Sequence, residues 1–457
     1  MPDSFNKIYI KGNQMTKFIF AVSLTVSLNS LLFSETILSL GERSSTNIDF
    51  MQANEIRDTT HIEQDPTPFT KEVELMSAEE QLEYDRIYNE KFFAPWTQSS
   101  VELSKGAKTW QFKYAKEKTY RSDGRRIPKS WYNYEMTNSN FKNSDTLNIP
   151  AITLRHTNLR LYPSSRGIYY DPKRAGEGFP FDYSQNSSVH VNTPVMLSHY
   201  SVDKLWIYAQ TSFASGWIKI EDLAFVDFEF QEKFQNGDYA ITVKDNLNLS
   251  DDNGEISLVK MGSIFPIDPI TKKYLMAKKD AKGYAKLTEI TVNDVDIIAH
   301  KPIKFNEYNL AYISKQLVGE PYGWGGKEKC RDCSALTRDF FSPFGIYLPR
   351  NSRQQAKSGA EFMSLKGLKS TQKKETILSY AKPFRSMLFV PGHITLYLGE
   401  KQGEPIILHN YWGVRLNDGS KRVMGRAIIS TTTPGKELAN VKKRSMLINT
   451  LTGIVNF

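Results

Sequence analysis

The sequence predicts an α+β protein in which an N-terminal helical segment and two small β-barrels precede a larger C-terminal domain. Three observations predict this order: a helical pattern that starts at Ser77, short strands divided by turns between residues 150 and 300, and a glycine turn that leads into a helix at Cys333. A chain of 457 residues suggests about three domains. The boundaries that we expect are residues 1–34 for a signal peptide, 35–65 for a flexible leader, 66–149 for a helical cap segment, 150–230 and 236–300 for the two barrels, and 305–457 for the C-terminal domain.

The composition favours a globular protein that is either soluble or anchored. The chain is 40% hydrophobic and 24% charged, which is ordinary for a globular protein, and no run of apolar residues is long enough for a polytopic membrane protein. The formal net charge of +9 favours contact with an anionic wall or membrane surface. Because the lysines are scattered and no nucleic-acid motif is present, we expect no nucleic-acid partner.

The first residues read as a secretory signal. Lys17 precedes the apolar run of residues 18–33, and Ser34 offers a small residue at the cut, with Met15 as a possible true start. We therefore expect export across the inner membrane to the periplasm or cell envelope, with no integral membrane domain in the mature chain. The alternative is an uncleaved N-terminal anchor, although the run is shorter than the ~20 residues that a span usually needs.

The helical cap segment and the barrels have different patterns. Ser77 is an N-cap with Glu80 three residues later, Leu82 and Ile87 supply apolar positions, and Pro95 is expected to end the helix. Between residues 150 and 300 short β-rich segments alternate with turn residues, which is typical of small barrels.

Cys333 is the candidate nucleophile. Asp332 reads as an N-cap, and Leu336 and Phe340 follow at helical spacing, so Cys333 is expected in the first turn of a helix with a buried apolar face. Unpaired backbone N–H groups at such a position favour the thiolate. Cys330 lies three residues earlier, so a redox pair or a disulfide between the two cysteines is the alternative.

Two strand-like runs supply a base for this nucleophile. On a period of two, His393 shares a face with Thr395 and Tyr397, and His409 shares a face with Ile407 in the next run. A paired His393 and His409 would place a base beside an orienting group. Asn410 is the alternative third group.

Four motifs lie around the candidate nucleophile and the histidines: Tyr322-Gly323-Trp324-Gly325-Gly326, Asp332-Cys333-Ser334, Leu348-Pro349-Arg350-Asn351-Ser352-Arg353-Gln354-Gln355, and Pro391-Gly392-His393 with Tyr397-Leu398-Gly399. Together they resemble the NlpC/P60 cysteine peptidases of bacterial cell-wall metabolism. The resemblance covers roughly residues 305–409, and Asn351 stands where relatives commonly have an aspartate. It implies a papain-like catalytic domain in which Cys333, His393 and His409 are catalytic, with neither a cofactor nor a metal.

The same resemblance implies substrate-binding roles for residues around the nucleophile. Tyr322 would point its hydroxyl at the reaction centre and help to hold the oxyanion, together with the backbone N–H of Cys333. Asp332 and Ser334 would face the substrate, and Ser352 would join them at the rim.

Residues 150–228 are similar to a bacterial SH3 domain of the kind found beside NlpC/P60 domains, and residues 236–300 look like a second, more divergent one. Relatives with paired SH3-like domains are γ-D-glutamyl-diamino acid endopeptidases, so the expected partners are peptidoglycan stem peptides or muropeptide fragments, cleaved through a thioester. The alternatives are a wall-binding protein with an idle catalytic domain, and an amidase or acyltransferase that also forms a thioester.

Overall fold

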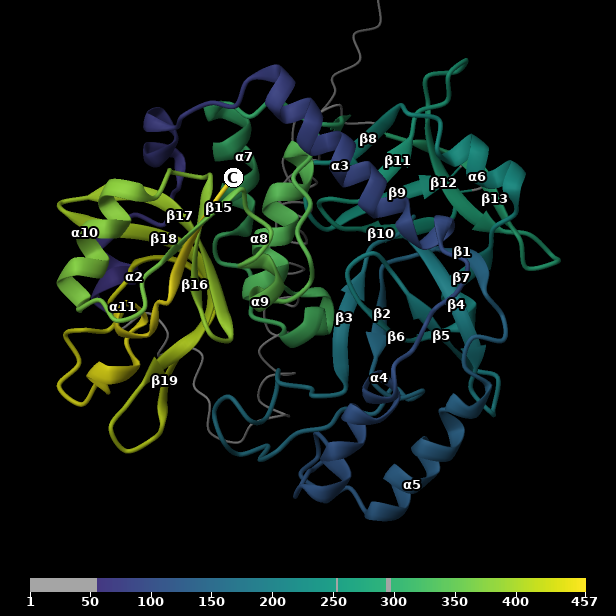
Figure 1. Cartoon of the computed structure of the whole chain (residues 1–457), viewed down its shortest axis with the longest axis horizontal. Coiled ribbons are helices and arrows are strands. Elements are labelled where there is room, and N and C mark those ends of the chain that lie inside the picture. Colours follow the sequence, from purple (N-terminus) through teal and green to yellow (C-terminus); the bar gives the residue numbers. More distant parts are fainter. Residues whose placement is uncertain (1–55, 252–253, 293–296) are drawn as a thin grey trace, which may run out of the picture. The chain divides into compact units, whose positions relative to one another are not determined.

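The computed structural model describes residues 56–251, 254–292 and 297–457 of the chain (Figure 1). The expected signal peptide and most of the expected leader lie outside these residues. The part of the leader that is described does not behave as a flexible tail. It forms helix α2 (Arg57–His61), and Ile56 is 1% exposed because it packs on Met424 and Ile428 of the C-terminal domain. The expectation of a flexible leader up to residue 65 is therefore wrong for residues 56–65.

The N-terminal region is helical, as the sequence predicts. Its main helix is α3 (Ala78–Thr97), where the Ser77 side chain accepts a hydrogen bond from the Glu80 backbone N–H at 3.1 Å. Leu82 is 61% exposed, and the buried face consists of aromatic side chains instead: Tyr88, Phe92, Phe93 and Trp96. These aromatic contacts hold the last turn, so the helix runs past Pro95 to Thr97. Shorter helices follow, namely α4 (Lys105–Thr109) and α5 (Lys129–Asn138).

The first β region forms one antiparallel seven-stranded sheet in the order β3-β2-β6-β5-β4-β1-β7. Alternate side chains along these strands point into one apolar core that includes Leu159, Val195 and Ile218. The strands are β1 (Ile149–Thr153), β2 (Thr157–Arg160), β3 (Gln185–Val189), β4 (Pro194–Tyr200), β5 (Trp206–Gln210), β6 (Ser215–Lys219) and β7 (Leu223–Phe225).

The second β region forms a four-stranded sheet, β10-β9-β13-β12, and a three-stranded sheet, β11-β8-β14. It follows helix α6 (Phe228–Phe234), and that this region is SH3-like stays a prediction. The strands are β8 (Tyr239–Thr242), β9 (Leu247–Asp251), β10 (Ile256–Val259), β11 (Ile264–Pro266), β12 (Tyr274–Lys279), β13 (Ala285–Thr291) and β14 (Ile298–His300).

The C-terminal domain packs helices on an antiparallel sheet in the order β15-β20-β16-β17-β18-β19 (Figure 1). Its first helix, α7 (Glu307–Leu317), buries Leu310, Ile313 and Leu317 completely, as their spacing predicts. Helix α8 (Cys333–Phe341) contacts β17 and β18. The other elements are α9 (Ser352–Gln355), β15 (Glu361–Ser364), α10 (Ser370–Tyr380), β16 (Ser386–Val390), β17 (His393–Lys401), β18 (Glu404–Arg415), β19 (Lys421–Thr431), α11 (Leu447–Thr450) and β20 (Gly453–Asn456).

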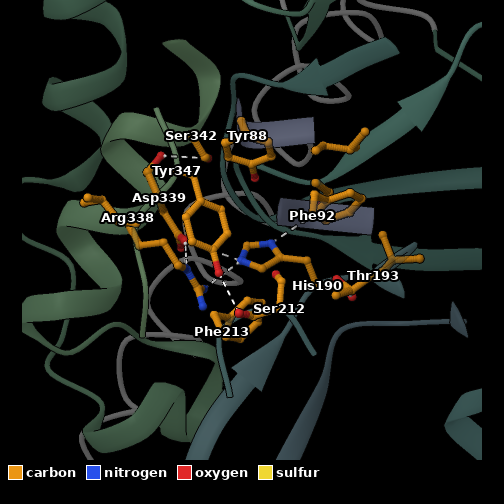
Figure 2. A pocket seen from close by; sticks show the side chains of 15 residues that line it. Tyr88, Phe92, His190, Thr193, Ser212, Phe213, Arg338, Asp339, Ser342 and Tyr347 are labelled. Carbon is orange, nitrogen blue, oxygen red and sulfur yellow. Dashed lines mark hydrogen bonds and ion pairs between the residues drawn. The ribbon is translucent and has the colours of Figure 1, made fainter. Parts of the chain in front are cut away.

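Away from Cys333, helix α8 packs at a point where α3, both β regions and the C-terminal domain meet. Figure 2 shows side chains from α3, both β regions and α8 around a small cavity of about 30 Å³. The His190 ring lies 3.2 Å from the Ser263 hydroxyl and 3.3 Å from the Arg338 guanidinium, and Arg338 donates to Asp339 at 3.0 Å. Because Arg338 and Asp339 belong to α8, these contacts set the position of the helix that begins at Cys333.

No helix in the described part of the chain is long and apolar enough to cross a membrane.

Candidate active site

Cys333 is the first residue of α8 and is 7% exposed. Asp332 caps the helix, because its Oδ1 accepts hydrogen bonds from the Ala335 backbone N–H at 2.9 Å and from the Ser334 hydroxyl at 3.1 Å. The backbone N–H of Ile394, the residue after His393, opposes the rise in the pKa of the Cys333 thiol, and α8 contacts β17. Cys333 therefore lies where a helix start meets the beginning of β17.

The glycine turn before Cys333 lets the first β region approach closely. Gly325 and Gly326 have positive φ of 62° and 86°, which disfavours other residues. A Cβ on Gly325 would lie 2.7 Å from the Gln185 carbonyl oxygen, and one on Gly326 would collide with the Ser188 hydroxyl. The turn is thus tied to strand β3, and the Gln185 side chain donates to the Gly325 carbonyl at 3.2 Å.

The two histidines form a pair on one face of the sheet. The Nε2 atom of His393 lies 2.9 Å from the Nδ1 atom of His409, and the Nε2 atom of His409 lies 3.0 Å from the Ser430 hydroxyl. Asn410 points elsewhere, since its amide donates to the Arg331 carbonyl at 2.7 Å. Of the two candidates for the third group, His409 is the one that contacts His393.

Burial favours the neutral forms of Cys333 and His393. It raises the pKa of the Cys333 thiol to about 12, with the nearby Asp332 carboxylate adding to the effect, and it lowers the pKa of His393 to about 4. Burial also holds the pKa of His409 well below its ordinary value, and the neighbouring His393 lowers it further. Burial therefore opposes the thiolate that the helix start was expected to favour.

Arg350 holds the residues on both sides of Cys333, a role that the sequence analysis did not assign. Its guanidinium donates to both carboxylate oxygens of Asp332, at 3.0 and 2.8 Å, to the Ser334 hydroxyl at 2.8 Å and to the Ser187 hydroxyl at 2.8 Å. Although burial alone would raise the pKa of Asp332, Arg350 holds it below its usual value. Asp332 and Ser334 are thus engaged with Arg350 and the helix start.

Aromatic side chains from two regions form a wall beside Cys333. Burial raises the pKa of Tyr322, and its closeness to the Cys333 sulfur raises it further. Phe181, from the first β region, stacks on Tyr322 with ring centroids 5.4 Å apart and meets Trp412 edge-on at 5.0 Å. No local signal in the sequence indicated this contact.

The remaining residues have structural positions. Ser352 begins α9, where Asn351 caps the helix by accepting from the Gln354 backbone N–H at 3.0 Å. Gln355, rather than Ser352, ties α9 to α8 through the Ser334 carbonyl at 2.8 Å. Cys330 and Cys333 are both free thiols. Among the described residues, no group of three His, Cys, Asp or Glu side chains could hold a metal ion.

A cysteine at a helix start, beside a histidine pair on an antiparallel sheet, defines the class of cysteine peptidases with a papain-like fold. Comparison with known families makes the assignment narrower. Residues 319–432 match the NlpC/P60 family, residues 168–219 match the SH3 domain (SH3b1 type), and residues 30–143 match the NLPC_P60 stabilising domain, N term. Residues 319–432 are therefore an NlpC/P60 family domain, of a family of cell-wall cysteine peptidases, and the chain also carries the family's N-terminal stabilising domain and an SH3b domain.

One solved structure agrees with this fold. The chain is similar to an NlpC/P60 endopeptidase from Photobacterium damselae subsp. piscicida, with 22% sequence identity and a TM-score of 0.79 over 86% of this chain and 97% of that one. An NlpC/P60 family protein from Bacillus cereus ATCC 10987 matches with 14% identity and a TM-score of 0.45, over 67% of this chain and 99% of that one. A comparison with curated proteins finds no match.

Proposed function

We propose that the protein is a cysteine endopeptidase that cleaves the bond between γ-D-glutamate and the diamino acid of peptidoglycan stem peptides or muropeptide fragments. The observation that supports this most directly is Cys333 at the start of α8, beside the strand that carries His393, whose ring is 2.9 Å from His409. The resemblance to endopeptidases with SH3-like domains supports the choice of bond.

The reaction follows from the neutral resting pair. His393 acts as a general base and takes the thiol proton of Cys333 as the sulfur attacks the amide carbonyl. The Tyr322 hydroxyl and the backbone N–H of Cys333 hold the oxyanion. The His393 imidazolium then protonates the leaving amine, and water hydrolyses the thioester with His393 again as the base.

The first β region limits which stem peptides enter, in this proposal. Phe181 contacts Tyr322 and Trp412, so the aromatic wall beside Cys333 is built partly by a region other than the catalytic domain. We expect this wall to favour stem peptides with a free N-terminal L-alanine. The protein acts in the periplasm or cell envelope, in keeping with the apolar run of residues 18–33.

The test is mass spectrometry of products from synthetic L-Ala-γ-D-Glu-diaminopimelate peptides, with free and with blocked N-termini. The expected result is release of L-Ala-γ-D-Glu from the free peptide by the protein and not by Cys333→Ala, which is the matched control. If the blocked peptide were cleaved as fast as the free one, the proposed selection of stem peptides by the first β region would be wrong.

The alternatives predict other products. Retention on purified wall with no cleavage of either peptide would favour a wall-binding protein. Transfer of the glutamyl group to an added amine would favour an acyltransferase. Either result would overturn the proposed hydrolysis.

A further inference from the structure

The His393–His409 pair has two possible arrangements of its protons. Each neutral imidazole carries one N–H, and the contact of 2.9 Å between Nε2 of His393 and Nδ1 of His409 holds one proton. If His393 donates, its Nδ1 keeps a lone pair and can accept the thiol proton. If His409 donates, Nδ1 of His393 carries the proton and cannot act as a base. The tautomer of His409 therefore decides whether His393 is competent.

Ser430 is placed to make this choice. Its Oγ lies 3.0 Å from Nε2 of His409 and 2.9 Å from the carbonyl oxygen of Thr431. A hydroxyl has one proton, and a carbonyl oxygen can only accept, so the Ser430 proton goes to Thr431. The Ser430 lone pairs then face His409, which satisfies Nε2 only when this nitrogen carries the proton. Nδ1 of His409 is then the acceptor for His393.

The Thr431 carbonyl can accept the Ser430 hydrogen bond because Thr431 lies on β19, a strand at the edge of the sheet. Strand β19 is the last strand in the sheet order, so in the described part of the chain the outer backbone groups of Ile429 and Thr431 have no strand partner. Asp58 instead accepts from the Thr431 backbone N–H and from its hydroxyl, both at 2.8 Å. The Gln64 side chain pairs with the N–H and the carbonyl of Ile429, both at 2.9 Å. These bonds hold the carbonyl that orients Ser430.

We propose that Ser430 is a positioning residue that fixes His409 as the Nε2–H tautomer, and through it leaves Nδ1 of His393 free to take the proton of Cys333. Its catalytic consequence rests on the proposed function, whereas the tautomers do not. Ser430 touches neither the substrate nor the sulfur, and it acts through the two imidazoles.

The first test is ¹⁵N NMR of the histidine-labelled full chain, with His393→Gln and His409→Gln variants to assign the signals. The wild type is expected to show both His393 and His409 protonated at Nε2. Ser430→Ala is expected to show a mixture of tautomers at His409. A wild-type His409 protonated at Nδ1, or an unchanged tautomer in Ser430→Ala, would overturn the proposal.

The second test is kinetic. Ser430→Ala removes the one neutral hydrogen bond that favours the Nε2–H tautomer of His409, so its kcat is expected to fall about fivefold with KM unchanged. Ser430→Thr keeps the hydroxyl and should restore kcat. The control is Ser386→Ala, which removes another fully buried serine of the same sheet that bonds Asn456 and the Lys382 backbone N–H. Equal losses of kcat in Ser430→Ala and Ser386→Ala would mean that Ser430 is merely structural.

The two tests separate this proposal from the proposed function. If the wild type cleaves no stem peptide, the proposed function fails, yet the NMR signals still report the tautomers. The rate of Cys333 alkylation by iodoacetamide then replaces kcat, because it needs the same base and no peptide. An alkylation rate in Ser430→Ala equal to that of the wild type would overturn the role of Ser430.

Discussion

Replacing Arg350 by methionine should destabilise the protein through Asp332. Arg350 is 6% exposed, and its loss would leave the Asp332 carboxylate, itself 8% exposed, without its cation. Breaking one partner of a buried pair costs about 3–5 kcal/mol, because a buried charge remains uncompensated. Since a folded protein is stable by about 5–15 kcal/mol, this is a large fraction of the total.

The double variant Arg350→Met, Asp332→Asn separates the charge from the packing. Asparagine is a good N-cap and keeps the bond to the Ala335 backbone N–H, but it carries no charge. We therefore expect the double variant to be more stable than Arg350→Met alone, so that the two changes are strongly non-additive.

The assay is urea unfolding followed by tryptophan fluorescence for the wild type, both single variants and the double variant. Arg350→Met should shift the midpoint to lower urea, and adding Asp332→Asn should recover part of the loss. If Arg350→Met costs less than about 1 kcal/mol, the value of an exposed ion pair, the unpaired charge is not the cause. The same conclusion would follow if the double variant were no more stable than Arg350→Met.

Two further predictions concern the site and its ionisation. Tyr322→Phe keeps the ring that stacks on Phe181 and removes the hydroxyl, so steady-state kinetics should show kcat falling about 100-fold with little change in KM; an unchanged kcat would show that backbone donors alone hold the oxyanion. The free energy of unfolding should fall as the pH drops below about 6.5. Below this pH the histidines of the unfolded chain bind protons, whereas the buried histidines of the folded chain stay neutral. For His393, with a pKa of about 4, the loss is at most about 3 kcal/mol between pH 6.5 and 4. Burial lowers the pKa of four more histidines, His156, His190, His199 and His409. Thermal unfolding at pH 7.5 and pH 5 tests this, and an equal or higher Tm at pH 5 would contradict it.

Local patterns predicted the parts of the site that depend on neighbours in the sequence. The N-cap at Asp332 and the helical spacing of Leu336 and Phe340 placed Cys333 at a helix start. Alternation with a period of two predicted which side chains of each strand share a face. In the structure the two antiparallel strands pair so that His393 and His409 lie on the same face of the sheet. Fold class followed from the same kind of evidence.

Patterns failed where the partner is distant in the sequence or where burial decides. Phe181 reaches Tyr322 from another region of the chain, and Arg350 bonds both Asp332 and Ser187. The protonation state of Cys333 depends on how far the fold excludes water from the thiol. The local rules for helix ends do not describe this exclusion. The buried face of α3 also differs from the expected one, because tertiary packing selected its aromatic side chains over Leu82.

The bonds of Asp58 and Gln64 to strand β19 have a consequence for folding. They join residues 373 and 365 positions apart, so the edge of the catalytic sheet closes only after nearly all of the chain has been synthesised. Contacts of such long range are slow to form, because the entropy of loop closure is lost before the contact is gained. The support beneath His409 is therefore among the last features to assemble, and truncation at either end of the chain removes the same support.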